Sequence, residues 1–337
     1  MLRKLIALSL LLTAIVVVLG AYVRLSDAGL GCPDWPGCYG QLSPHHAEDE
    51  IRAAHAAEPY GPVSMPKAWK EMIHRYLAST LGFLIIAIAW LSWRASKRGE
   101  GSAAVAIALV GVVIFQGLLG KWTVTLLLKP AIVTLHLLGG LTVLGMLTWL
   151  FARARGLSRQ VVGSGMALAA RVALVLLVVQ ITLGGWVSTN YAALACTDLP
   201  TCHGEWLPQM DVGNAFHVLR ELGMTAEGDL LSREALTAIH FMHRVGAVVA
   251  GLYLIVFGLR LRRLEPLRGL GNGLVAAVVL QIALGIANVL LSLPLPLAVA
   301  HNAGAALLIV LTVTANYRLR AAEPVRASSG VIAEARG

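Results

Sequence analysis

The sequence predicts an all-α polytopic membrane protein, with eight transmembrane helices arranged as two pseudo-symmetric four-helix bundles. Of its 337 residues, 57% are hydrophobic and only 13% are charged, whereas a soluble domain carries about 25% charged residues. A second observation is a set of motifs that recurs roughly 165 residues further along the chain, which is the mark of an internal repeat. The composition therefore predicts the membrane, and the repeat predicts the two bundles.

Eight apolar windows are long enough to cross a hydrocarbon core of ~30 Å, which takes about 20 residues. They are 5–23, 71–93, 103–122, 131–152, 168–189, 236–259, 270–292 and 297–317. The first window is longer than the ~7–15 apolar residues of a signal peptide. We therefore expect it to remain as a membrane span.

The charges between these windows predict the orientation. Arginine and lysine gather after alternate spans, while the two long loops at 24–70 and 190–235 are acidic on balance. Positively charged loops face the cytoplasm, so we expect both termini there. No transit peptide precedes the first span, which favours a bacterial plasma membrane over that of an organelle. The net charge of +9 follows from the same loops. No basic stripe interleaved with aromatic residues is present, so we expect no nucleic-acid partner.

The internal repeat divides the chain near residue 160, into an N-terminal half at 1–160 and a C-terminal half at 161–337. The matching motifs are CPDWPGC at 32–38 with CTDLPTC at 196–202, His74-Arg75 with His243-Arg244, and QGLLG from Gln116 with QIALG from Gln281. Each half holds four spans, so both halves have the same orientation. Their pseudo-symmetry axis should lie along the membrane normal.

Four histidines fall within the spans at matching positions of the repeat, two in each half: His74, His136, His243 and His301. A lone membrane histidine is commonly explained by an interhelical hydrogen bond, but two pairs at matching positions favour a ligand role. Helix bundles hold metal cofactors between facing side chains, and histidine is a haem ligand. The additional Cys, Asp or Glu ligands of zinc or copper sites are missing. The histidines therefore predict a porphyrin iron with two axial imidazoles in each half.

Glu71 lies three residues before His74 and shares its helix face, whereas the corresponding residue of the second half is His240. A membrane carboxylate is costly unless it is paired, protonated or functional. The asymmetry predicts that the first half carries out chemistry and that the second stores or relays electrons. The alternative is a simple ion pair with a basic neighbour such as Arg75. We expect His240 to hydrogen-bond or to contact a haem propionate rather than to ligate iron.

Arg75 and Arg244 follow two of the histidines directly, and two interpretations are open for them. Their long side chains can extend to the membrane interface, or they can bind haem propionates, since a guanidinium pairs bidentately with a carboxylate. Gln116 and Gln281 lie inside apolar spans, where they are expected to hydrogen-bond between helices.

The four cysteines form two Cys-x5-Cys pairs, both in the predicted outer loops. An oxidising compartment favours disulfides, and this spacing does not match the usual zinc patterns. We therefore expect the disulfides Cys32–Cys38 and Cys196–Cys202.

With these motifs in place, the sequence resembles the haem A synthase family, in the bacterial form with two cysteine pairs. The resemblance rests on the eight spans, the repeat, EMIHR at 71–75, the second His-Arg, the two later histidines and the cysteine pairs. It covers nearly the whole chain. It implies a membrane oxidoreductase that oxidises a methyl group of haem O to a formyl group, which gives haem A for terminal oxidases.

The resemblance also implies roles for individual residues. His243 and His301 would ligate a resident haem b, and His74 and His136 would face the substrate haem O. Glu71 would be needed for the chemistry.

The same resemblance connects Cys32–Cys38 with activity and Cys196–Cys202 with structure. A haem O synthase would supply the substrate, and an electron donor that the sequence does not identify would complete the reaction. A homo-oligomer is compatible with the sequence.

Two other functions are open at this point. One is a membrane b-type cytochrome that only transfers electrons, although such carriers usually need haems near both membrane faces and all four histidines here fall in the outer leaflet. The other is a haem carrier, which would bind haem exchangeably and would not need Glu71.

Overall fold

The computed structural model describes residues 1–321, and long helices make up most of it. Eight of them are apolar and long enough to cross a membrane. These are α1 (Leu2–Leu25), α3 (Met65–Lys97), α4 (Ala104–Thr125), α5 (Pro130–Ala154), α6 (Ser164–Thr189), α8 (Arg233–Leu261), α9 (Arg268–Leu290) and α10 (Leu295–Arg318). The prediction of an all-α protein with eight membrane helices is confirmed.

Prolines mark where three of these helices begin. Pro66, Pro130 and Pro296 all lie in the first two positions of their helices, where the missing N–H costs no hydrogen bond and the fixed φ favours the helix. Helix α3 begins six residues before the predicted window 71–93. Its first turns are polar, and hydropathy detects only the part of a helix that lies in hydrocarbon.

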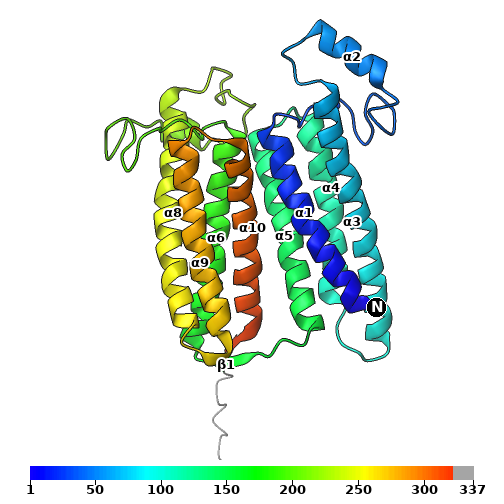
Figure 1. Cartoon of the computed structure of the whole chain (residues 1–337), viewed down its shortest axis with the longest axis vertical. Coiled ribbons are helices and arrows are strands. Elements are labelled where there is room, and N and C mark those ends of the chain that lie inside the picture. The colour runs from blue at the N-terminus through cyan, green and yellow to red at the C-terminus, as the bar shows by residue number, and fades with distance from the viewer. Residues whose placement is uncertain (322–337) are drawn as a thin grey trace, which may run out of the picture.

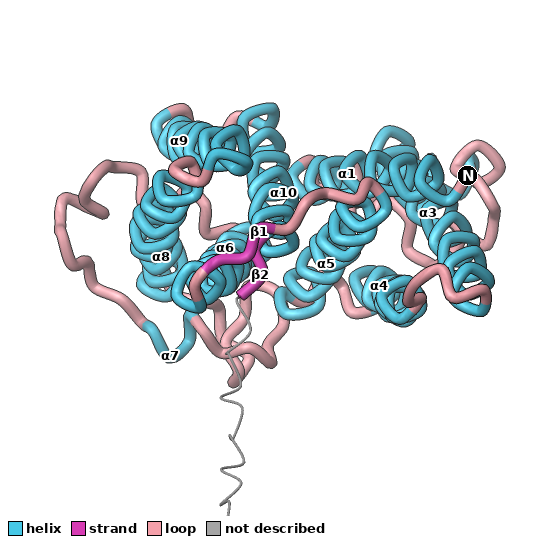
Figure 2. Tube along the Cα trace, turned by 90° about the horizontal axis from the view of Figure 1, so that it is seen from below, coloured by secondary structure: helices cyan, strands magenta, loops and turns pink. Residues whose placement is uncertain are grey.

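The helices form two neighbouring groups, which Figures 1 and 2 show from the side and from one end. The first helix group consists of α1, α3, α4 and α5, and the second helix group of α6, α8, α9 and α10. Inside the groups, α1 packs on α3 as α6 does on α8, and α4 packs on α5 as α9 does on α10. Between them, α5 and α10 contact each other, α1 contacts α10 and α5 contacts α6.

A two-stranded sheet lies at the end of the molecule where α1 begins and α10 ends. Strand β1 (Gln160–Val162) pairs in parallel with β2 (Leu319–Ala321). We call this end the basic end, because the arginine-rich connections gather there. The sequence did not predict these strands. The expected domain boundary near residue 160 falls at β1, and the division into two domains stays a prediction.

The opposite end carries the two long loops, with α2 (Glu48–Ala57) in the first and α7 (Val212–Ala215) in the second. At this end the groups meet through residues that correspond in the repeat. Arg24 donates a 2.8 Å hydrogen bond to the backbone oxygen of Ser188, 164 residues later. Tyr191 donates one of 2.9 Å to Asp27, across the same separation.

Apolar side chains fill the part of each helix group that lies nearer the basic end. Ile85, Leu109 and Leu147 are fully buried in the first group, and Leu254 and Leu274 belong to the cluster of the second. The span histidines lie nearer the loop end. The histidines therefore lie between the apolar core of each group and the cysteine loops.

Candidate functional site

Two of the span histidines pack their rings against glycines of the neighbouring helix. A Cβ atom on Gly20 of α1 would lie 2.9 Å from Cε1 of His74, and one on Gly184 of α6 would lie 2.9 Å from Cε1 of His243. Real Cβ atoms do not approach other atoms so closely, so only glycine leaves room for each ring. The two contacts occupy matching places in the two helix groups.

The two later histidines have the same kind of support. A Cβ on Gly120 would lie 3.3 Å from Cε1 of His136, and one on Gly285 would lie 3.2 Å from Cε1 of His301. His74 is close enough to His136 to act on it electrostatically, and the same holds for His301 and His243. The structure thus brings each predicted pair together within one helix group.

Two glutamines hold the backbone beside the later histidines. Gln116 Nε2 donates a 2.7 Å hydrogen bond to the backbone oxygen of His136, and Gln281 Nε2 donates one of 3.0 Å to that of His301. This is the interhelical role that the sequence predicts for both glutamines. Their buried Oε1 atoms have no hydrogen-bond partner within residues 1–321.

The ring nitrogens separate His243 from the other three histidines. Nδ1 of His74, His136 and His301 is buried without a partner among the described residues. Nδ1 of His243 instead lies 3.0 Å from Nε2 of Gln180, which also donates a 3.1 Å bond to the His243 backbone oxygen. A polar residue that meets a ligand candidate in this way is a functional candidate in its own right.

Sequence reasoning missed Gln180. It lies four residues before Gly184 in an apolar span, and the corresponding residue of the first half is Val16. Gly246 makes space for it, because a Cβ there would lie 2.3 Å from Gln180 Oε1; the first half has Leu77 at this place. Gln180 could have been found from the sequence as a polar residue in an apolar span whose counterpart in the other half is apolar.

The donor set of each helix group fits a haem. Each offers two imidazoles and buried polar atoms without partners, whose free-energy cost a bound group could relieve. Over the described chain, the only cluster of three candidate ligands for a metal ion is Cys196, Cys202 and His203, and its two sulfurs are joined in a disulfide. Paired imidazoles without thiolates suit a porphyrin iron, which brings four nitrogens of its own.

Glu71 is the one buried acidic residue within residues 1–321, at 4% exposure. Its Oε1 forms an ion pair with Arg75, one helical turn further along α3. Its Oε2 accepts a 3.0 Å hydrogen bond from the backbone N–H of Cys32. The ion-pair alternative from the sequence is therefore realised, and the carboxylate is also tied to the loop that contains the first disulfide.

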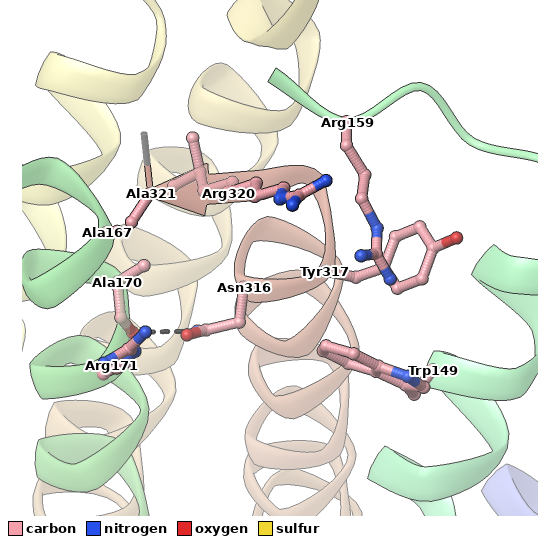
Figure 3. A pocket seen from close by; sticks show the side chains of 10 residues that line it. Trp149, Arg159, Ala167, Ala170, Arg171, Asn316, Tyr317, Arg320 and Ala321 are labelled. Carbon is pink, nitrogen blue, oxygen red and sulfur yellow. Dashed lines mark hydrogen bonds between the residues drawn. The ribbon is translucent and has the colours of Figure 1, made fainter. Parts of the chain in front are cut away.

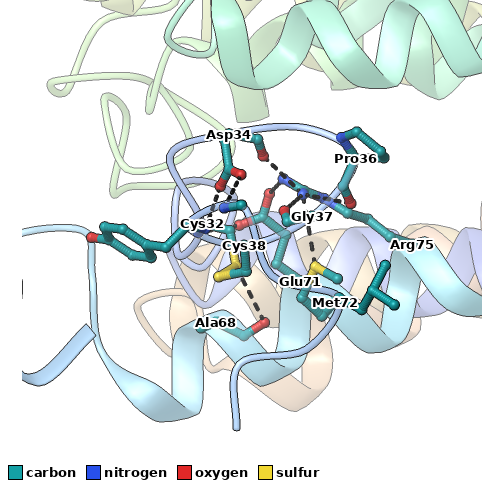
Figure 4. Close-up of a disulfide and its surroundings, with 12 residues drawn as sticks. Cys32, Asp34, Pro36, Gly37, Cys38, Ala68, Glu71, Met72 and Arg75 are labelled. Atoms are coloured by element: carbon teal, nitrogen blue, oxygen red, sulfur yellow. Dashed lines mark hydrogen bonds and ion pairs between the residues drawn. A yellow bond between two sulfur atoms is a disulfide. The ribbon is translucent and has the colours of Figure 1, made fainter. Parts of the chain in front are cut away.

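The first cysteine loop, residues 32–41, closes over this ion pair, as Figure 4 shows. The disulfide Cys32–Cys38 is formed. Asp34 accepts backbone hydrogen bonds from Tyr39 and Gly40 at 2.6 and 2.7 Å. Arg75 donates to the backbone oxygens of Asp34 and Gly37 at 2.9 and 2.6 Å. One guanidinium thus joins the loop to the buried acid.

The second cysteine loop, residues 196–205, is built alike. The disulfide Cys196–Cys202 is formed, and Arg244 donates to the backbone oxygens of Cys196, Asp198 and Thr201 at 2.7, 2.8 and 2.9 Å. His240 takes the place of the acid, and its Nδ1 accepts a 3.3 Å bond from the N–H of Cys196. The expected hydrogen-bonding role of His240 is what the structure contains.

The charge of Asp198 is stabilised inside the second loop. The Thr201 hydroxyl and the backbone N–H groups of Gly204 and His203 hold the pKa of this carboxyl well below its usual range. The group lies outside the membrane helices, so its ionised form helps to keep the loop closed at neutral pH.

Arg75 and Arg244 therefore both bind the backbone of the cysteine loops at the loop end of the helices. Haem propionates as further partners of the two guanidiniums stay a prediction. Nε of Arg244 is buried without a hydrogen-bond partner among residues 1–321, so this side chain retains a donor that no described group uses.

Comparisons with known proteins agree with this arrangement. The family COX15-CtaA, described as cytochrome oxidase assembly protein, matches residues 3–313. A haem A synthase of Shewanella oneidensis is 42% identical over 94% of this chain and 96% of its own length. Haem A synthases of Methylobacterium radiotolerans and Paracoccus denitrificans are 30% and 29% identical, over 86% and 92% of this chain and 82% and 85% of their own. The chain therefore belongs to the COX15-CtaA family.

Proposed function

We propose that this protein is a haem A synthase, a membrane oxidoreductase that oxidises a methyl group of haem O to the formyl group of haem A. The relatives named as haem A synthases match it over most of their length and most of this chain. The observation that carries the proposal is the pair of glycine-supported histidine sites, of which only the first has a buried acid beside it.

The two sites are proposed to differ in what they hold. His74 and His136 would face haem O, and His243 and His301 would hold a resident haem b. Bound haem b supplies one-electron transfer. The Gln180 contact supports this division, because it fixes one ring of the second site, whereas the rings of the first site have no such partner in the described chain.

Glu71 is proposed to accept a proton released as the methyl group is oxidised. Its carboxylate lies three residues before His74, on the same face of α3. A buried carboxylate near the reacting centre is a suitable general base. The bonds from Arg75 and Cys32 hold both carboxylate oxygens in a fixed position on this face of α3.

The membrane placement belongs to the same proposal. The basic end would face the cytoplasm of a bacterium, with both termini there, and the two cysteine loops would face the outside. Haem O would arrive from a haem O synthase, an oxidant would accept the electrons that leave the methyl group, and a separate donor would supply any electrons needed to activate that oxidant. The contacts of Arg24 with Ser188 and Tyr191 with Asp27 support a pseudo-twofold axis between the halves.

Extracted-haem analysis tests the function directly. The protein is produced together with a source of haem O, purified, and its haems are separated and identified. We expect haem A and haem b from the unaltered protein. Glu71→Gln should abolish haem A and retain haem b, since the second helix group is unchanged.

The matched variants are His136→Ala and His301→Ala. His136→Ala should lose haem A but keep haem b, and His301→Ala should lose haem b. Two stable haem b groups without haem A would instead identify a b-type cytochrome. An exchangeable haem that is chemically unchanged, with no effect of Glu71→Gln, would identify a carrier.

A further inference from the structure

A basic pocket of about 240 Å³ opens at the basic end, between the two helix groups. Figure 3 shows its lining, which includes three arginines: Arg159, Arg171 and Arg320. Among the described residues that line it, none is acidic. The pocket thus places guanidinium groups, Arg159 and Arg171 among them, at the level where an α-helical membrane protein meets lipid headgroups.

Two aromatic side chains of the pocket pack against the guanidinium of Arg159. The guanidinium of Arg159 lies 4.5 Å from the ring centre of Tyr317 and 5.9 Å from that of Trp149. The two rings meet edge to face, with centroids 5.0 Å apart. Stacking of this kind holds a guanidinium in place without neutralising it, so the charge of Arg159 remains available to an anion.

An apolar groove of about 500 Å³ begins where the basic pocket ends. Trp149 lines both. The groove lies between α5 of the first helix group and α6 and α10 of the second, and its lining includes Leu138, Val178, Ile309 and Val313. It is almost wholly apolar, so it suits a hydrocarbon chain and offers little to a polar ligand.

The length of the groove matches one membrane leaflet. Along α5 its lining runs from Leu138 to Trp149, which corresponds to roughly 16 Å at about 1.5 Å per residue. Half of a ~30 Å hydrocarbon core is about 15 Å. A molecule with its anionic group among the arginines would therefore extend its chain along the groove to about the middle of the membrane.

We propose that one anionic phospholipid binds between the two helix groups, with its phosphate in the basic pocket and an acyl chain in the apolar groove. The charge selects an anionic group, and the adjoining apolar groove with its leaflet-length match selects a phospholipid over a soluble anion. Basic pockets between membrane helices recognise anionic headgroups in this way. The lipid fills the junction of the halves, and none of the four span histidines lines the pocket or the groove, so the proposal does not depend on the haem chemistry.

Native mass spectrometry of the purified full-length protein tests this. After removal of bulk lipid, phosphatidylglycerol or phosphatidylcholine is added in matched amounts, and bound lipid is counted per chain. We expect one phosphatidylglycerol to remain bound where phosphatidylcholine is lost. Arg159→Gln with Arg171→Gln should weaken phosphatidylglycerol binding about 25-fold, at roughly fivefold per charge. Val178→Trp, which fills the groove and keeps every arginine, should also abolish retention.

Arg262→Gln with Arg263→Gln is the matched control, since both residues are exposed near the basic end and neither lines the pocket. This control should leave phosphatidylglycerol binding unchanged. If the double pocket variant is unstable, Arg171→Gln alone replaces it as the test variant. Equal retention of the two lipids overturns the proposal, as does an equal loss in the control. Displacement of the lipid by millimolar inorganic phosphate, with binding insensitive to Val178→Trp, overturns it in favour of a soluble-anion pocket.

Discussion

In the first helix group, Nδ1 of His74 has no partner within the described chain and a buried acid lies one turn away. In the second, Gln180 reaches Nδ1 of His243, and His240 stands where the acid would be. The other contacts are the same in both groups: each histidine ring packs on a glycine, and an arginine binds the cysteine loop. The two groups share a scaffold and differ in the atoms around the ring nitrogens.

This difference in the surroundings of the histidine rings bears on whether a helix group holds a haem or reacts with one. A ligating histidine that donates its outer N–H to an acceptor has its ring orientation fixed and its basicity raised. The Gln180 amide can bond to His243 in either protonation state of Nδ1. Its Nε2 donates to an unprotonated Nδ1. After a half-turn of the amide, Oε1, which is unpartnered among residues 1–321, would accept from a protonated Nδ1. This supports the proposal that the second group holds its haem permanently and that the first exchanges its occupant.

The largest effect on stability is expected from the two arginines. Arg75→Gln leaves Glu71 buried and unpaired, and breaking a buried ion pair costs about 3–5 kcal/mol. Arg244→Gln removes bonds to backbone oxygens only and should cost less, on the order of 1–3 kcal/mol. Unfolding of the purified protein in detergent, followed with temperature or denaturant, measures both.

The double variant Glu71→Gln with Arg75→Gln sharpens this test. Removal of the stranded charge should restore a large part of the stability that Arg75→Gln loses, because the unpaired carboxylate is the main cost. If the two arginine variants prove equally unstable, Glu71 does not distinguish the first loop from the second.

A smaller effect is expected when the second site is made to resemble the first. Gln180→Val introduces the residue found at the corresponding position, Val16, and removes the bond to His243. Loss of such an outer partner lowers metal affinity about 10–100-fold. Transfer of haem to an acceptor protein should become faster by a similar factor, and the midpoint potential of the retained haem b should shift.

Thr182→Val is the matched control on the same helix, since within residues 1–321 the Thr182 hydroxyl bonds only to the Val178 backbone oxygen. It should leave haem transfer and the potential unchanged. A Gln180→Val protein that behaves like this control would show that His243 needs no outer partner.

The smallest effect concerns the pH dependence of the second cysteine loop. The pKa of Asp198 is lower in the folded protein than in the unfolded chain, so its carboxylate adds stability above about pH 4, and this is lost as the pH falls through the folded value. Asp198→Asn should destabilise the protein at pH 7 and progressively less in acid. Thermal unfolding between pH 7 and pH 3 measures the difference, with Asp34→Asn as the first-loop counterpart. A difference that stays constant with pH would contradict this role.

The parts of the fold that follow from local pattern were predictable. Hydropathy gave eight spans, and the Cys-x5-Cys spacing gave both disulfides, because each depends on neighbouring residues. The early start of α3 was missed, since its polar first turns lie beyond the apolar window. Strands β1 and β2 were missed because they are short and pair across 159 positions, from Gln160 to Leu319.

The site was predictable where the repeat marks it and unpredictable where it depends on distant contacts. The four histidines and Glu71 stand out as polar residues in apolar spans, and the two copies reinforce one another. The attachment of Arg75 to the first cysteine loop joins residues 38 to 41 positions apart, a loop conformation that spacing alone does not fix. Gln180 was overlooked because the comparison of halves looked for shared residues, whereas its significance lies in having no counterpart.

The contact between Arg24 and Ser188 bears on how such a chain could arise. Positions related by an exact twofold axis that lie on it must face their own copies, so a dimer of identical halves would set arginine against arginine, and like charges repel. Joined in a single polypeptide, the two copies are free to diverge, and a guanidinium can meet a backbone oxygen at 2.8 Å instead. Either half alone, paired with its own copy, would therefore lose this contact between the two helix groups.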